Sequence, residues 1–109
     1  WRSFLNGMLV CHQSFYVRAD IARQFHYNLR YRFSGDFDWC VRIMKDAVQK
    51  GLPLYNTRQI LTDYLAEGMT TKNHRKSLFE RLRIMCRHYG CMAAIIQHLW
   101  FVVRAMVKR

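Results

Sequence analysis

Hydrophobic residues recur at helical spacing after Asp36 and predict a central helix. They form a single stripe, because positions three and four apart lie on the same side of a helix. Ser34 or Asp36 can serve as the N-cap, and Gly51 followed by Pro53 ends the pattern. The stripe consists of Phe37, Cys40, Val41, Met44, Ala47 and Val48.

The last third of the chain predicts two more helices, separated by Gly90. The first has a stripe of apolar residues covered on its other sides by basic ones. The second, residues 91–108, is apolar nearly all round, interrupted by Gln97, His98 and Arg104 before its basic end. The stripe of the first helix consists of Leu78, Leu82, Met85, Cys86 and Tyr89.

Short apolar and β-branched runs elsewhere predict strands at residues 8–11, 14–18, 54–55 and 59–64. A short helix is expected from Asp20 through Arg23, and an ordered loop over residues 26–34. The pattern is therefore α/β, with a few short strands, one central helix and two C-terminal helices. So few apolar strands cannot form a complete sheet with both faces covered, so further strands are expected upstream of Trp1.

The charge of the chain is strongly positive, with 18 Lys and Arg against 7 Asp and Glu. From residue 70 to residue 109 there are nine basic residues and one acidic residue, Glu80. Such a tail favours an anionic partner, either nucleic acid or the anionic inner leaflet of a membrane. A basic helix face that is merely solvated is the alternative.

The four cysteines, at positions 11, 40, 86 and 91, show neither zinc-finger spacing nor a disulfide framework. All have apolar neighbours, which predicts small buried thiols in a reducing compartment such as the cytoplasm. The chain opens on Trp1 without a signal-peptide pattern, and we expect it to be a fragment of a longer protein.

Two carboxylates at the predicted entry to the central helix are the main candidates for chemistry. Asp36 and Asp38 stand at i and i+2, and Arg42 lies four residues after Asp38 and can pair with it. This spacing predicts that Asp38 is structural and that Asp36 is the free carboxylate, aimed into a cleft. The alternative is that both are simply acids at a helix start, where the helix dipole favours them.

Four segments together resemble the second half of bacterial family 2 (GT-A type) glycosyltransferases, which use nucleotide sugars to build polysaccharides. They are GMLVCHQSFYVR at residues 7–18, SGDFDWCVR at 34–42, LTDY at 61–64 and GMTT at 68–71. The resemblance implies that residues 1–71 form the acceptor-side part of an incomplete GT-A (Rossmann-like) domain. Residues 72–109 would then be basic amphipathic helices that associate with membrane.

The resemblance also implies roles for individual residues. Asp36 matches the catalytic base, which deprotonates the acceptor hydroxyl, although Gly35 stands where many members have Glu. His12 matches a histidine that contacts the acceptor or the diphosphate; an ordinary hydrogen-bonded histidine is the alternative. Residues 68–71 match a loop that closes over the donor in this family. The further candidates for substrate binding are Gln13, Asp38, Arg42, Thr70 and Thr71.

The Asp-x-Asp formed by Asp36 and Asp38 is not expected to bind metal, because it opens a helix rather than following a buried strand. The family implies a divalent metal, Mg²⁺ or Mn²⁺, that is bound outside this chain together with the nucleotide-sugar donor. The chain alone is therefore expected to be inactive. Trp39 is expected to pack rather than to stack on a sugar.

The expected partners are a glycan or lipid-linked acceptor and an anionic membrane surface, at the cytoplasmic face of the bacterial plasma membrane. Residues 91–107 are short for a membrane span and contain polar groups, so an in-plane interfacial helix is predicted, with burial against the rest of the enzyme as its alternative. The competing function is a small basic module that binds nucleic acid or a membrane surface without catalysis. Aromatic residues interleaved with arginines over residues 27–33 favour nucleic acid, but no known nucleic-acid motif is present.

Overall fold

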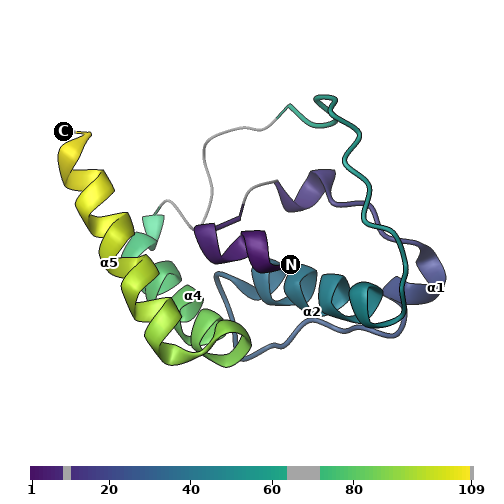
Figure 1. Ribbon diagram of the computed structural model, residues 1–109, viewed down its shortest axis with the longest axis horizontal. Helices are drawn as coiled ribbons and strands as arrows, with labels where there is room; N and C mark the ends of the chain where they lie inside the picture. The colour runs from purple at the N-terminus through teal and green to yellow at the C-terminus, as the bar shows by residue number, and fades with distance from the viewer. Residues whose placement is uncertain (9–10, 64–71, 109) are drawn as a thin grey trace.

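The computed structural model describes residues 1–8, 11–63 and 72–108, and its regular elements are helices (Figure 1). Two are short 3-10 helices and one is a single α-helical turn. The elements in chain order are η1 (Arg2–Asn6), η2 (His12–Ser14), α1 (Ala19–Ala22), α2 (Gly35–Gln49), α4 (His74–Tyr89) and α5 (Cys91–Val107).

The predicted α/β fold class is wrong for the part of the chain that the structure describes, which contains no strand. Residues 15–18, 54–55 and 59–63 run without regular structure, and the predicted strand at 8–11 lies partly outside the described residues. The reason is that a strand needs a ladder of backbone hydrogen bonds with a neighbour, and among the described residues no backbone hydrogen bond joins these segments to one another. In the later two segments apolar side chains point to solvent, since Tyr55 is 88% exposed and Ile60 is 94% exposed, whereas Phe15 packs edge-on against Trp39 of α2.

The central helix is confirmed as α2, which begins after Ser34 and buries its predicted stripe. Phe37, Cys40 and Val41 are fully buried, whereas Val48 at the end of the stripe is half exposed. The Ser34 hydroxyl does not cap its own helix; it donates to the Ser77 carbonyl oxygen of α4 (3.2 Å) and lies 3.2 Å from the Ser77 hydroxyl. The start of α2 is thereby fixed to α4.

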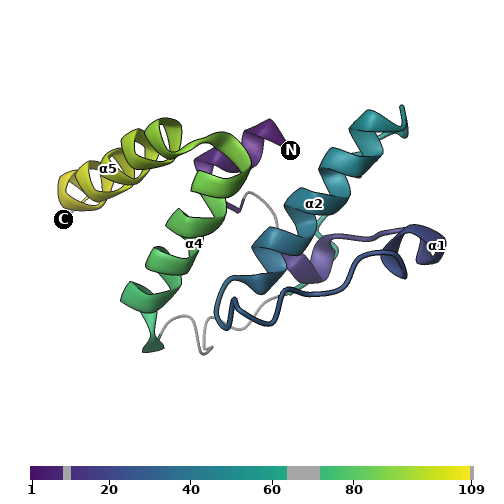
Figure 2. The ribbon, with the colours of Figure 1, turned by 90° about the horizontal axis from the view of Figure 1, so that it is seen from below.

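The two C-terminal helices are also confirmed, with their boundary at Gly90. Gly90 has a φ of 90°, a left-handed conformation that glycine adopts without the steric cost of a side chain. The chain can therefore turn sharply between the helices, and Figure 2 shows α4 and α5 diverging from this junction, with α4 lying between α5 and α2.

The hydrophobic core forms where α2, α4, η1 and the start of α5 meet. The ring of Phe4 in η1 lies 6.0 Å from that of Phe37, and Trp1 stacks on Tyr89 of α4 with ring centroids 5.3 Å apart. Both predicted parts of the chain, 1–71 and 72–109, contribute to this cluster. Its buried members are Phe4, Phe37, Cys40, Val41, Met44, Ile84, Met85 and Ala94.

Candidate functional site

Asp36 lies in the first turn of α2, where the structure brings it together with His12. The Nδ1 atom of His12 in η2 is 3.0 Å from Oδ2 of Asp36, and because a carboxylate only accepts, this nitrogen carries the proton. The other carboxylate oxygen accepts a hydrogen bond from the backbone N–H of Phe37 (2.8 Å). The side chain of Asp36 is 29% exposed and that of His12 is 44% exposed, so both can be reached from solvent.

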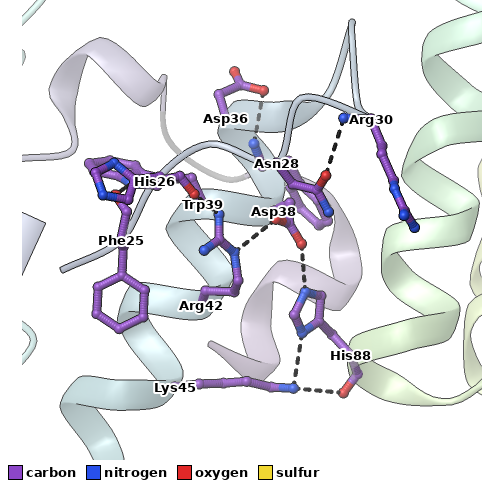
Figure 3. Close-up of polar contacts among 11 residues, drawn as sticks. Phe25, His26, Asn28, Arg30, Asp36, Asp38, Trp39, Arg42, Lys45 and His88 are labelled. Carbon is purple, nitrogen blue, oxygen red and sulfur yellow. Dashed lines mark hydrogen bonds and ion pairs between the residues drawn. The ribbon is translucent and has the colours of Figure 1, made fainter.

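Asp38 has the structural role that its spacing predicted. Its side chain is 3% exposed, and Arg42 Nε donates to its Oδ2 at 2.8 Å, which confirms the expected i, i+4 ion pair. Its other oxygen lies 2.8 Å from Nε2 of His88 in α4. Figure 3 shows Asp38 pointing toward these two partners while Asp36 points away from them.

The pKa of Asp38 reflects two opposing influences. Burial is the largest and acts to raise the pKa. The hydrogen bond from His88, followed by the charge of Arg42 and its hydrogen bond, outweighs burial and holds the pKa of Asp38 below its usual value. Asp38 is therefore a buried, ionised carboxylate that joins α2 to α4.

His88 extends this cluster to Lys45. The ammonium group of Lys45 lies 3.1 Å from Nδ1 of His88 and donates to the His88 carbonyl oxygen at 3.2 Å. An ammonium group can only donate, so Nδ1 accepts and the ring proton sits on Nε2, facing Asp38. Lys45 also lies over the ring of Trp1, 4.6 Å from its centroid. Sequence reasoning identified neither His88 nor Lys45.

Arg42 and Trp39 hold the loop that precedes α2. Arg42 donates to the backbone carbonyl of His26, and Trp39 Nε1 donates to that of Phe25 at 3.0 Å. The ring of Trp39 stacks on Tyr27, with centroids 5.4 Å apart, so its expected packing role is confirmed. Figure 3 shows Arg42 and Trp39 beside Phe25 and His26, so these two side chains of α2 hold the ordered loop in place.

Glu80, the acidic residue of the basic tail, was missed as a structural residue. Its carboxylate on α4 accepts three backbone hydrogen bonds, from the N–H groups of Arg32 (2.9 Å), Phe33 (2.7 Å) and Ser34 (3.0 Å). Successive backbone N–H groups can form a concave anion site, and here a carboxylate of the same chain fills the one that lies just before α2. Glu80 stands alone among many basic residues in this part of the sequence, and that contrast was the signal that could have identified its structural role.

Arg81, the next residue on α4, lies behind Asp36. Its guanidinium group is 5.4 Å from the centre of the Phe37 ring, and its Nε atom is buried without a hydrogen-bond partner among the described residues. Burial lowers the pKa of Arg81, and the negative charge of Asp36 partly offsets that effect. The start of α2 therefore has cationic or hydrogen-bond-donating groups on two sides, His12 and Arg81.

The remaining predicted site residues lie elsewhere. Gln13 is exposed, and its side-chain oxygen accepts a hydrogen bond from the Cys11 thiol at 2.9 Å. Thr70 and Thr71 lie outside the described residues. The structure therefore brings Asp36 and His12 into one site, and groups Asp38 and Arg42 in a separate, buried cluster.

A divalent metal does not fit the Asp-x-Asp of this chain. Both oxygens of Asp38 face donors, Arg42 on one side and His88 on the other, so neither is turned toward Asp36 to share a cation. Among residues 1–8, 11–63 and 72–108, no group of three or more His, Cys, Asp or Glu residues is arranged to hold a metal ion.

The four cysteines have free thiols, but only Cys40 is fully buried, and burial raises its pKa to about 12. The prediction that all four are buried is wrong for Cys91, which is exposed at the start of α5. Cys91 directly follows the sharp turn at Gly90. The local sequence pattern could not predict the direction in which α5 leaves this turn, and so could not predict that Cys91 is exposed.

The sequence matches no family model, and neither a curated protein nor a solved structure shows a match to it.

Proposed function

We propose that this chain is the acceptor-binding, base-bearing part of an inverting glycosyltransferase and that Asp36 is its general base. The observation that carries the proposal is the contact between Asp36 and His12, two residues 24 positions apart that the motif resemblance had named separately. The proposal does not rest on the fold, because none of the predicted strands forms in the described residues.

The chemistry needs a carboxylate that can be reached by a sugar hydroxyl and held in a fixed direction. Asp36 meets both conditions, since it is partly exposed and each of its oxygens already accepts one hydrogen bond. A carboxylate oxygen has a second lone pair, which can accept the proton of the acceptor hydroxyl. The deprotonated oxygen attacks the anomeric carbon of the nucleotide sugar, and the bond to the nucleoside diphosphate breaks.

Asp38, Arg42 and His88 hold the turn of helix that carries Asp36 and do not take part in the reaction. They tie the first turn of α2 to α4 through a carboxylate that is almost completely buried. Such a tie keeps the backbone under Asp36 in one position, as a base that must meet a substrate hydroxyl requires. The donor site and any metal lie in the part of the enzyme that we propose precedes this chain.

The test uses the full-length parent protein with its own membranes as the source of acceptor. Release of nucleoside diphosphate from UDP-, GDP- and dTDP-sugars is measured for the wild type and for Asp36→Asn. Loss of a general base predicts a rate lower by about 10²–10⁴-fold in Asp36→Asn. His12→Gln is expected to show a smaller loss, because it orients Asp36 without accepting the proton.

Asp20→Asn is the matched control, because Asp20 also lies in the first turn of a helix, and its carboxylate pairs with exposed Arg18. It is expected to retain the wild-type rate. Unchanged release in Asp36→Asn, or a parent gene that encodes no nucleotide-binding domain before Trp1, would rule the proposal out. The basic binding-module interpretation would then replace it.

A further inference from the structure

The outward face of α5 is an extended apolar surface that the described residues leave uncovered. Apart from Ala94, no described residue of this helix is buried. Its exposed apolar residues follow helical spacing and form one continuous stripe, without a charged side chain among them. The stripe consists of Met92 (80% exposed), Ile96 (64%), Leu99 (62%), Trp100 (56%), Val103 (44%) and Met106 (64%).

A groove beside this stripe has apolar walls and a basic rim. It lies between α4 and α5, has a volume of about 950 Å³, and includes Leu78 and Leu82 on one wall and Val102 on the other. Arg75, Arg81 and Arg104 line it as well, and none of the described residues that line it is acidic. Apolar walls and a cationic rim are complementary to a molecule with a hydrocarbon chain and an anionic group.

The positive charge on α4 and α5 also favours a ligand with an anionic group. Residues 72–108 contain eight Lys and Arg residues and one acidic residue, Glu80. The carboxylate of Glu80 is already engaged by three backbone N–H groups and faces the loop before α2. The basic residues around the groove therefore have no acidic counterpart on their own helices, which also disfavours pairing with a second copy of this chain.

We propose that α5 and the groove dock this chain onto an anionic phospholipid bilayer, with α5 lying in the plane of the membrane surface. The stripe would enter the boundary between headgroups and acyl chains, and Arg75 and Arg104 would contact lipid phosphates. Trp100 would lie at the headgroup level, where tryptophan is favoured. This inference does not depend on the proposed transferase activity.

The in-plane orientation follows from the length of α5. Its 17 residues extend about 26 Å, which is shorter than the hydrocarbon core of about 30 Å. No helix within the described ranges is both long and apolar enough to cross a membrane. A surface position satisfies the apolar stripe without requiring Arg104 to enter the hydrocarbon.

The proposal is tested by sedimentation of the 109-residue chain with vesicles of phosphatidylcholine, with and without about a third phosphatidylglycerol. We expect binding to the anionic vesicles that is at least about tenfold tighter than to pure phosphatidylcholine and that weakens as salt is raised. Leu99→Glu is expected to weaken this binding by about tenfold or more. Ile60→Glu is the matched control, because it makes the same change at a fully exposed residue far from α5 in sequence.

The arginines are tested separately from the stripe. Arg75→Gln combined with Arg104→Gln is expected to remove most of the preference for phosphatidylglycerol, while Arg30→Gln, at an exposed loop position, changes it little. Helix content by circular dichroism confirms that each variant is folded. Quenching of tryptophan fluorescence by spin-labelled lipid should be strong in the wild type and largely lost in Trp100→Phe.

Three results would overturn the proposal. One is the absence of vesicle binding by the folded chain, and another is equal binding to both vesicle types at all salt concentrations. The third is a concentration-dependent dimer that Leu99→Glu dissociates while vesicle binding stays unaffected, because the stripe would then be covered by a second copy.

Discussion

The helices α2 and α5 have nearly the same length, 15 and 17 residues, but the described part of the chain buries one face of α2 and leaves most of α5 exposed. Eight residues of α2 are buried, including one carboxylate, whereas Ala94 is the buried residue of α5 among those described. Both helices have an apolar stripe at the spacing expected of an amphipathic helix. The pattern therefore predicts that a helix has a face to cover, but not what covers it.

The charges of the two regions differ in the same way. In α2 the charged groups face partners: Asp38 faces Arg42 and His88, and Lys45 contacts His88. Around the groove of α5, the arginines are gathered without an acidic residue among the lining side chains. A helix whose apolar stripe is buried and whose charged groups are paired within the chain can position a site. A helix whose apolar stripe is exposed and whose charged groups are unpaired presents a surface to a partner.

The largest effect on stability is expected at Asp38. In Asp38→Ala, Arg42 and His88 lose a buried anionic partner, and breaking such a pair costs about 3–5 kcal/mol of unfolding free energy. Urea unfolding followed by circular dichroism measures this change. Asp20→Asn, which breaks an exposed pair with Arg18, should cost far less, because solvent screens that pair. Similar losses in both variants would show that the Asp38 cluster does not tie α2 to α4.

A matched pair of isoleucines tests the comparison between covered and uncovered faces directly. Ile84 on α4 is fully buried, and Ile84→Ala should destabilise the chain by about 2–5 kcal/mol. Ile96 on α5 is 64% exposed, and Ile96→Ala should change stability by no more than about 0.5 kcal/mol. Urea unfolding of the two variants in parallel gives both values. A loss in Ile96→Ala as large as in Ile84→Ala would mean that the α5 face is buried in solution.

The helices could be predicted from the sequence because their signals are local. The stripe of α2, its start after Ser34 and the break at Gly90 all depend on residues within a few turns. The predicted strands at 14–18, 54–55 and 59–64 could not be judged in this way, since a strand is stable only beside a partner elsewhere in the chain. Apolar runs without such a partner remain irregular, as Tyr55 and Ile60 show.

In the candidate site, too, contacts between residues close in sequence could be predicted, and contacts between distant residues could not. The pair of Asp38 with Arg42 was predictable from its i, i+4 spacing. The contacts of Asp38 with His88, 50 residues away, and of Glu80 with the loop before α2 arise only when α4 packs on α2. His12 and Asp36 were both named from their motifs, but only the tertiary structure shows that they touch.

The last effect that we predict is the acid dependence of stability, and it comes from Asp38. Its pKa is lower in the folded protein than in the unfolded chain, because His88 and Arg42 together outweigh the raising effect of burial. The folded state therefore binds its proton less readily, and this contribution to stability is complete above the unfolded pKa of about 4. It is lost as the pH falls through the folded pKa. The unfolding free energy should accordingly decline as the pH is lowered below about 4.

Arg42→Gln sharpens that measurement, since it leaves the carboxylate and its hydrogen bond with His88 in place. Removing the guanidinium charge should raise the pKa of Asp38 and reduce the slope of unfolding free energy against pH in the acid range. Unfolding in urea at several pH values between about 3 and 6 gives both slopes. Identical slopes in the wild type and in Arg42→Gln would mean that the charge of Arg42 does not hold Asp38 ionised, and that the hydrogen bond from His88 is enough to lower its pKa.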